Sequence, residues 1–352
     1  MFVVQKALLL ILCVAGCRQP YTPTSSTDMA ELLPTMVWHK STDTPSSAPR
    51  ADMPIVLVPE QRALFGYGGL PLTQTDAWSF SLKDDSWSRL TLGTTNPPGR
   101  DGHCAAYMPI QTQVLFVGGH GPDVTTPPPS TLFSVGNDAY APVTGDRSSA
   151  GDGCAAAYLQ RSQGVIVYGG SATPDETWLF DGTKSAYTKL VPAGSPGGRT
   201  GASLVADPGL ASDAGISDFL VLYGGRKDGV ESGAVWIYNG TAWAELGTTA
   251  DPASSITDEP RPRGRSQAAV ALDPSRHLLY VFGGMRQGVY LADLWVLELA
   301  STTWHRLALA GGPVGRAGAL VGWDAVLDRM MLFGGRGDAG LLSDGWTLSV
   351  SL

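Results

Sequence analysis

Residues 265–307 read RSQAAVALDPSRHLLYVFGGMRQGVYLADLWVLELASTTWHRL, and their pattern of short apolar runs indicates the type of fold. It contains four short β-type runs, at 265–273, 278–284, 293–299 and 303–307. Polar or glycine-containing turns separate the runs. Short runs of this kind between turn residues favour an antiparallel meander of four strands.

Six times along the chain, an apolar run ends in Gly-Gly. The pairs begin at residues 68, 118, 169, 224, 283 and 334, so the intervals are 50, 51, 55, 59 and 51 residues. A period of this length predicts a radial or stacked repeat architecture. The apolar runs are nearly continuous rather than alternating, which predicts strands buried on both faces, as in blades packed around an axis. Residues that recur in every repeat are interpreted as scaffold, and a specific activity is expected where the repeats differ.

Aromatic residues recur at two positions of the repeat. The third strand carries Trp78, Phe133, Trp178, Trp236, Trp295 and Trp346, and the fourth carries Trp87, Tyr140, Tyr187, Trp243 and Trp304. An arginine-led strand, a Gly-Gly strand, a strand with an aromatic residue and then a tryptophan resemble the Kelch repeat. The resemblance covers residues 36–352. Repeats 2 and 3 depart from it, because Tyr140 and Tyr187 replace the tryptophan.

The N-terminal segment is expected to complete the last repeat. The sequence stops directly after the third strand of repeat 6, and residues 35–52 resemble the fourth-strand stretch 86–102. We therefore predict that residues 36–40 form the outer strand of the final blade, which would remove exposed strand edges. The expected fold is all-β: residues 35–352 form a six-bladed Kelch-type β-propeller with four antiparallel strands per blade.

The first 34 residues resemble an export signal followed by a tether. Lys6 precedes a short apolar run that ends in Val14-Ala15-Gly16-Cys17, which resembles the bacterial lipobox. Residues 1–16 are then a lipoprotein signal peptide, Cys17 carries the lipid, and residues 17–34 form a flexible tether. The alternative is an ordinary secretory signal with a chance cysteine. Because Arg18 rather than aspartate follows Cys17, the expected location is the bacterial cell envelope, anchored in the outer membrane.

The composition of the chain argues against some classes of binding partner. There are 24 Lys and Arg against 32 Asp and Glu, a formal net charge of −8, and the only basic cluster is the short stretch 261–265. This balance argues against a nucleic-acid partner. No histidine or cysteine spacing is typical of a metal site, so neither a metal nor a cofactor is expected.

Two cysteines remain after Cys17 in the propeller region, Cys104 and Cys154, on the first strands of repeats 2 and 3. An oxidising compartment permits a disulfide between them. However, the alignment places Cys154 beside His103 and Cys104 one position further on, so their side chains have opposite parity. We therefore predict two buried, unpaired thiols.

Arginines open the first strands of the repeats: Arg50, Arg100, Arg147, Arg199, Arg265 and Arg316. If the first strands line the channel, these side chains gather at one mouth, where they can bind carboxylates or phosphates. His103, on an inner strand, is a further candidate. The alternative is that each arginine fixes a loop by bonding backbone carbonyls, and its presence in every repeat favours that structural role.

The sequence favours a binding module over an enzyme. Neither a nucleophile elbow nor a phosphate loop is present, and the repeats differ most in their loops, where recognition usually resides. The expected function is a non-catalytic, monomeric scaffold of the cell envelope that binds a peptide, protein or glycan at its loop face. The alternative is a carbohydrate-active enzyme, similar to a sugar-acid mutarotase or epimerase, that uses the central channel.

Overall fold

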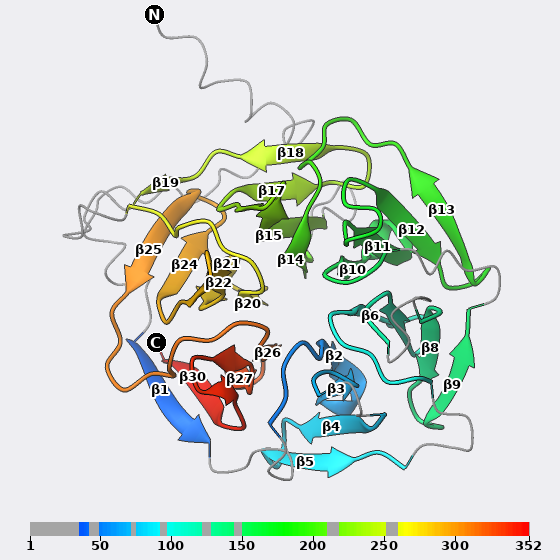
Figure 1. Cartoon of the computed structure of the whole chain (residues 1–352), viewed down its shortest axis with the longest axis horizontal. Coiled ribbons are helices and arrows are strands. Elements are labelled where there is room, and N and C mark those ends of the chain that lie inside the picture. The colour runs from blue at the N-terminus through cyan, green and yellow to red at the C-terminus, as the bar shows by residue number, and fades with distance from the viewer. Residues whose placement is uncertain are drawn as a thin grey trace, which may run out of the picture.

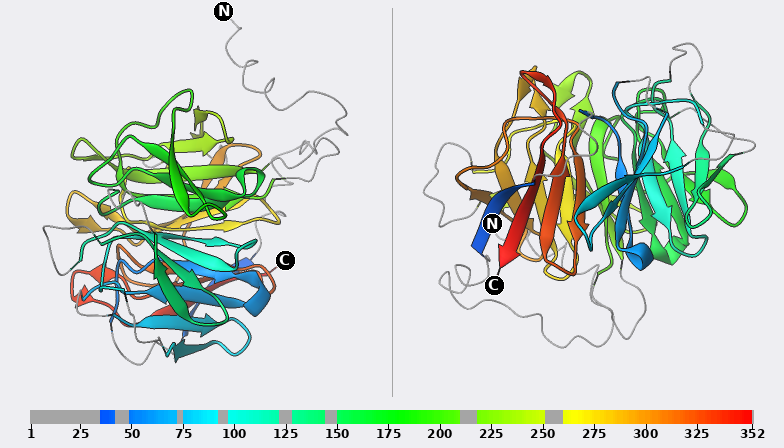
Figure 2. Two further views of the ribbon diagram at one scale, coloured as in Figure 1. Left: turned by 90° about the vertical axis from the view of Figure 1, so that its right-hand side faces the viewer. Right: turned by 90° about the horizontal axis from the view of Figure 1, so that it is seen from below.

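The computed structural model describes residues 35–41, 49–71, 75–91, 97–121, 128–143, 150–209, 218–250 and 260–351. Six antiparallel blades surround a central channel (Figure 1), and the views in Figure 2 show the blades standing side by side. The predicted all-β, six-bladed fold is confirmed. Among the described residues, no helix has the length and apolar character needed to cross a membrane.

The strands run outward from the channel in chain order. Blade 1 contains β2 (Ile55–Val58), β3 (Ala63–Tyr67), β4 (Ala77–Ser81) and β5 (Ser86–Arg89). Blade 2 contains β6 (Cys104–Met108), β7 (Gln113–Val117), β8 (Thr131–Ser134) and β9 (Ala139–Pro142). Blade 3 contains β10 (Ala155–Leu159), β11 (Gly164–Tyr168), β12 (Thr177–Asp181) and β13 (Ala186–Leu190).

The second half of the ring carries additional short strands. Blade 4 contains β14 (Thr200–Asp207), β15 (Phe219–Lys227), β17 (Val235–Tyr238) and β18 (Trp243–Leu246), and β16 (Val230–Glu231) also pairs with β15. Blade 5 contains β20 (Ala269–Asp273), β21 (Leu278–Phe282), β24 (Leu294–Glu298) and β25 (Thr303–Leu307), with β19 (Thr249–Ala250) parallel to β25. Blade 6 contains β26 (Leu320–Asp324), β27 (Arg329–Phe333), β30 (Gly345–Ser351) and β1 (Thr35–Ser41).

The N-terminal strand closes the ring as predicted. Strand β1 pairs antiparallel with β30, and Trp38 lies opposite Leu348; Figure 2 shows this blue strand beside the red one. The Trp38 ring is buried and meets Phe282 of blade 5 edge-on, with ring centroids 5.4 Å apart. The closing strand is therefore fixed both by its backbone ladder and by its packing on the neighbouring blade.

The hydrophobic core lies between the blades. Each of six clusters of buried residues joins two neighbouring blades around the ring. Phe80 of blade 1 packs on Phe333 of blade 6, for example, with centroids 4.9 Å apart. All five residues of β21 are buried. Burial of one such apolar side chain contributes about 1.5–3 kcal/mol, so continuous apolar second strands are what two-sided packing requires.

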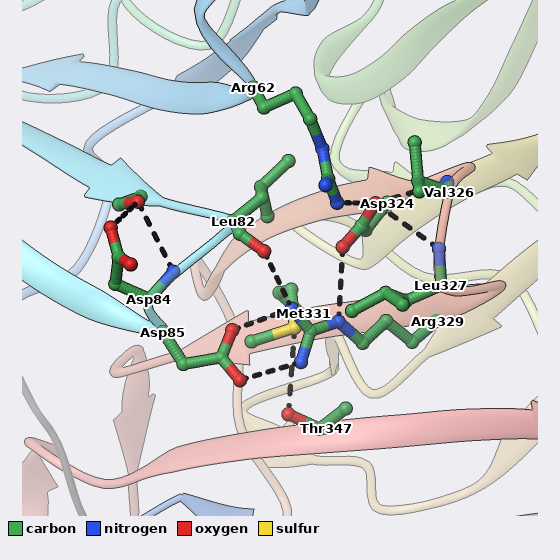
Figure 3. Close-up of polar contacts among 11 residues, drawn as sticks. Arg62, Leu82, Asp84, Asp85, Asp324, Val326, Leu327, Arg329, Met331 and Thr347 are labelled. Atoms are coloured by element: carbon green, nitrogen blue, oxygen red, sulfur yellow. Dashed lines mark hydrogen bonds and ion pairs between the residues drawn. The ribbon is translucent and has the colours of Figure 1, made fainter.

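Ion pairs reinforce the seam where the ring closes, at the strand ends opposite the Gly-Gly turns (Figure 3). From β27, Arg329 reaches the turn between β4 and β5 and donates to both carboxylate oxygens of Asp85, at 2.8 and 2.5 Å. Its Nε donates to Asp324 at 3.1 Å, and Arg62 of blade 1 contacts the same carboxylate at 3.4 Å. Blades 6 and 1 are thus joined by charge as well as by packing.

Candidate functional site

Five arginines fasten the strand turns at the channel mouth from inside the protein. Each donates from Nη1 to the carbonyl of the first glycine of its Gly-Gly pair. These bonds are Arg50 to Gly68 (2.7 Å), Arg100 to Gly118 (3.4 Å), Arg199 to Gly224 (2.7 Å), Arg265 to Gly283 (2.9 Å) and Arg316 to Gly334 (2.8 Å). All five side chains are buried. In these five blades the arginine bonds a backbone carbonyl, as expected of a side chain that fixes a loop, and the side chains that line the channel mouth are different ones.

Three blades add a carboxylate and a tryptophan to this arrangement. In blade 5, Asp293 accepts two hydrogen bonds from Arg265, at 2.6 and 2.8 Å, and a third from Trp295 Nε1 at 2.6 Å. Burial alone would raise the pKa of Asp293, but the hydrogen bonds and charge of Arg265 outweigh it and hold this pKa below its ordinary value. Asp76 in blade 1 and Asp344 in blade 6 occupy the same position. We call this arginine, aspartate and tryptophan set the arginine staple.

Blade 3 differs from the other five at the arginine position. The backbone carbonyls of the five arginines each accept a bond from the second glycine of the preceding blade, and in blade 3 the acceptor is Gly151. Arg147, predicted for this role, lies outside the described residues. Its place in the register is therefore taken by Gly151, which has a φ of 68°. A side chain at position 151 would collide with Ser171, so this position itself cannot carry an arginine.

A closed ring of backbone hydrogen bonds surrounds the channel two residues beyond the arginine position. Gly102 N–H donates to Asp52 O, Gly153 to Gly102, Gly201 to Gly153, Gln267 to Gly201, Gly318 to Gln267, and Asp52 to Gly318, at 2.7–3.1 Å. All six residues have positive φ, which suits glycine. Asp52 and Gln267 adopt φ of 54° despite their side chains, a strain of about 1–3 kcal/mol each that is common at functional sites.

The prediction of two free thiols is wrong. Cys104 and Cys154 form a disulfide, with Cα atoms 5.5 Å apart, that joins the inner strands of blades 2 and 3. The ring bond from Gly153 to Gly102 brings these strands together at the channel. The opposite parity of the two side chains does not prevent the bond, because neighbouring blades meet with opposite faces. The one-residue offset between the cysteines therefore points their sulfur atoms at each other.

The mouth encloses a cavity of about 520 Å³ that reaches all six blades. Its charged or titratable lining side chains are Asp52, Asp101, His103, His120, Asp152, Arg226 and Arg336. Asp52 is 7% exposed, pairs with Arg336 Nη2 at 2.9 Å and accepts a hydrogen bond from Gln267 at 3.0 Å. Burial is the main cause that raises the pKa of Asp52 to about 6, since the charge of Arg336 only partly offsets it.

Two further acidic side chains, Asp101 of blade 2 and Asp152 of blade 3, lie beside Asp52 in the cavity lining. His120 stands between Asp101 and Asp152, with its ring nitrogens 3.7 and 3.6 Å from their carboxylate oxygens. Burial raises the pKa of Asp101, and the charge of Asp152 adds to this effect, although His120 and Arg336 oppose it. Three carboxylates from three adjacent blades therefore share one side of the cavity.

The predicted site residue His103 lines the cavity wall. It is 5% exposed and packs against Phe116 with ring centroids 5.7 Å apart. Neither ring nitrogen makes a hydrogen bond of good geometry, although the backbone of Tyr67 lies close enough to favour the protonated ring. Burial prevails and lowers the pKa of His103 well below its ordinary value. In the described part of the chain, no group of three or more His, Cys, Asp or Glu side chains is arranged to hold a metal ion.

Blades 4, 5 and 6 raise short hairpins around this mouth. They are built by β15 and β16, by β22 (Met285–Arg286) with β23 (Val289–Tyr290), and by β28 (Arg336–Gly337) with β29 (Gly340–Leu341). Val230 and Val289 are 67% and 61% exposed near the tips of the first two. The loops after Gly225, Gly284 and Gly335 thus form a rim that is partly apolar.

Sequence comparisons agree with this architecture. A model of the KLHDC2/KLHL20/DRC7 Kelch-repeats domain matches residues 214–351. An F-box/kelch-repeat protein of Arabidopsis thaliana is 29% identical over 206 residues, which cover 53% of this chain and 40% of that relative. The chain therefore spans less than half the length of the curated relative. The six Gly-Gly repeats and the closed ring of blades agree with these similarities: the protein is a six-bladed β-propeller, and its residues 214–351 match a Kelch-repeat domain.

Proposed function

We propose that this propeller is a binding module whose mouth, rimmed by the hairpins of blades 4–6, engages a partner protein. The observation that carries the proposal is the pairing of exposed Val230 and Val289 with a recessed, charged cavity at the same mouth. Exposed apolar residues around a polar centre offer both contact area and orientation. The closed ring beneath them holds the loops in place, as scaffolds that present binding loops do.

Peptide selection on the full chain tests this function. A displayed library of random linear peptides is selected on the protein, and the affinities of the selected peptides are measured by fluorescence polarisation. The double variant Val230→Asp, Val289→Asp should weaken binding by about tenfold or more, because it places charge where apolar contacts form. The matched control is Ile110→Asp, Val326→Asp, which changes side chains of similar exposure, 59% and 65%, at the opposite strand ends. Equal binding by the two variants would contradict the proposal.

The second candidate function is chemistry on a sugar acid in the cavity. It is favoured by the raised pKa values of Asp52 and Asp101, since buried carboxylates near an arginine are typical of acid–base sites. Arg336 would bind the substrate carboxylate and Asp52 would transfer the proton. The test is NMR spectroscopy of a panel of sugar acids with the wild type and with Asp52→Asn. Anomer or epimer exchange that is lost in the variant would support an enzyme, and its absence across the panel would remove this candidate.

The proposal includes a cell-envelope location, with a lipid on Cys17 as the anchor. Residues 1–34 lie outside the described residues, so support comes from the lipobox-like stretch 14–17 and from the Cys104–Cys154 disulfide, a bond that persists in oxidising compartments. Two or more acyl chains give stable anchoring. Expression of the full chain in a bacterium fed radiolabelled palmitate should label the protein, and Cys17→Ala should abolish the label. An unlabelled wild type would exclude the anchor.

A further inference from the structure

We propose that the protein rests on the lipid surface of its membrane with the face opposite the mouth, so that the hairpin rim points away from the bilayer. We call this opposite face the base. It carries the turns between first and second strands, at residues 59–62, 109–112, 160–163, 274–277 and 325–328. The inference rests on the proposed lipid anchor at Cys17 and specifies which surface that anchor brings to the lipid.

The N-terminal strand enters the propeller at the base. Strand β1 begins with Thr35 and reaches the mouth end of β30, at Gly345, with Ser41. At its other end β30 is bonded to the blade 6 turn, since Val350 N–H donates to Asp328 O at 3.0 Å. Thr35 pairs with the residue that follows Val350. The segment that precedes β1 is therefore attached at the base, on the outer side of blade 6.

The height of a blade separates the mouth from this attachment point. Strand β30 runs from mouth to base over seven residues, and at about 3.4 Å per residue it covers about 20 Å. Residues 18–34 link Cys17 to Thr35, and a flexible tether of that length spans on the order of 20 Å on average. A lipid on Cys17 thus holds the base next to the bilayer and leaves the mouth farther away by the height of a blade.

The base exposes apolar side chains that a lipid surface can take up. Val326 and Leu327 of the blade 6 turn are 65% and 54% exposed, and Ile110 of the blade 2 turn is 59% exposed. The mouth also exposes Val230 and Val289, so apolar exposure alone does not choose between the two faces, whereas the attachment of the chain does. Because the acyl chains of the anchor supply most of the affinity, the side chains at the base need only favour one orientation.

Charge pairing at the base lowers the electrostatic cost of lipid contact. Two carboxylates flank the exposed apolar residues of the blade 6 turn, and both are paired: Asp324 with Arg329 at 3.1 Å, and Asp328 with Arg276 at 3.0 Å. Anionic headgroups repel unpaired carboxylates within about a Debye length, and a paired arginine offsets this repulsion. The part of the base nearest to Thr35 can therefore approach the headgroups.

Fluorescence quenching on the lipid-bearing protein tests the orientation. The full chain is expressed in a bacterium, purified from its membranes and reconstituted into vesicles of phosphatidylethanolamine and phosphatidylglycerol that contain doxyl-labelled phosphatidylcholine as the quencher. Val326→Cys at the base and Val289→Cys at the mouth carry one thiol-linked fluorophore each, and they are matched because the native side chains are 65% and 61% exposed. Cys104 and Cys154 are bonded to each other and do not take the label.

The label at position 326 should lose at least about half of its emission, because contact with the bilayer brings it to within about 5–10 Å of the acyl chains. The label at position 289 should keep its emission in these vesicles and should be quenched by aqueous iodide instead. The added changes Ile110→Asp and Leu327→Asp should reduce the lipid quenching at position 326, because they place charge on the base. The thermal midpoint of each variant checks folding.

The possible results separate this inference from the proposed function. Equal lipid quenching at the two positions, or stronger quenching at position 289, would overturn the orientation, while the anchor would stand. Quenching that persists in the Ile110→Asp, Leu327→Asp background would overturn the contact through the base side chains. A lipid-bearing wild type that does not float with the vesicles would overturn the anchor and the orientation together. Peptide binding at the mouth is measured in solution, so its success or failure does not depend on any of these results.

Discussion

Blades 5 and 3 achieve the same fold at the channel mouth with different chemistry. In blade 5, buried Arg265 bonds both the Gly283 carbonyl and the Asp293 carboxylate. Blade 3 has Gly151 at the arginine position, and its strand is instead bonded covalently to blade 2 through Cys104 and Cys154. The comparison shows that the recurring requirement is a fixed inner strand, which either a buried ion pair or a disulfide can satisfy.

Blades 3 and 5 also differ in the acidic residue that bonds to the tryptophan of the third strand. Glu176 of blade 3 occupies the position of Asp293, since it accepts a hydrogen bond from Trp178 as Asp293 does from Trp295. One charge partner of Glu176 is Lys189, which is 48% exposed, whereas Arg265 is fully buried. The same acid–tryptophan pair is therefore held inside the protein in blade 5 and near solvent in blade 3.

Removal of an arginine staple should lower the free energy of unfolding more than any of the changes below. Arg265→Ala leaves the Asp293 carboxylate largely buried without its cation and the Gly283 carbonyl without its donor. Loss of one partner of such a buried pair destabilises by about 3–5 kcal/mol. Urea unfolding at neutral pH measures the effect. Arg226→Ala, at an exposed arginine in a neighbouring hairpin, is the control and should change stability little; a loss of less than about 1 kcal/mol for Arg265→Ala would contradict a structural staple.

Removal of the disulfide should cause the second largest loss of stability. The double variant Cys104→Ser, Cys154→Ser should lower the free energy of unfolding by about 2–4 kcal/mol, because the unfolded chain regains the freedom of the closed loop of 50 residues. Hydrogen exchange should rise in β6 and β10 more than in β20 and β26. A uniform increase around the ring would show that the bond stabilises the whole propeller rather than the inner strands of blades 2 and 3 in particular.

Blades 3 and 5 also show which features of the structure can be predicted from the sequence alone. The Gly-Gly period gives six blades, and the resemblance of residues 35–52 to 86–102 identifies the closing strand, because periodic hydrophobic patterns reflect the packing that every blade repeats. The Gly151 position could have been found from spacing, since 169 − 151 gives the 18-residue interval of blades 1, 2, 5 and 6, whereas Arg147 gives 22. The prediction of free thiols was wrong because opposite parity was expected to point the two side chains to different faces, whereas in neighbouring blades those two faces oppose each other.

The cavity residues were missed for a different reason. Asp52 and Gln267 stand where the other four blades have glycine, so their signal is a departure from the repeat rather than a motif. The sequence pattern does not reveal that these positions meet across the channel, because residues 52 and 267 become neighbours only when the ring closes. Arg336 likewise follows a Gly-Gly pair at a position where the repeats vary. Its role follows from its distance to Asp52, which no local pattern encodes.

The two kinds of carboxylate should respond oppositely to acid. The raised pKa of Asp52, about 6 against an ordinary 3.8, means that the folded protein takes up this proton before the unfolded chain does. Its contribution to stability is complete below pH 4 and is lost as the pH rises through 6, which corresponds to at most about 3 kcal/mol. Asp293, whose pKa is lowered, contributes stability that is lost only at still lower pH. Stability should therefore rise less between pH 7 and pH 5 in Asp52→Asn than in the wild type, as followed by urea unfolding; identical pH profiles would contradict the raised pKa.

Lys189→Ala should have the smallest effect and thereby gives the sharpest contrast with Arg265→Ala. Both substitutions remove the cation that faces a tryptophan-bonded acid, but Glu176 is 26% exposed, so water replaces the lost partner. Exposed ion pairs contribute about 0–1 kcal/mol, so the free energy of unfolding should fall by no more than that and should depend on salt. Calorimetry at low and high ionic strength measures both properties. A loss as large as that of Arg265→Ala would mean that blade 3 relies on this ion pair after all, and the disulfide could then no longer be regarded as the replacement for its arginine.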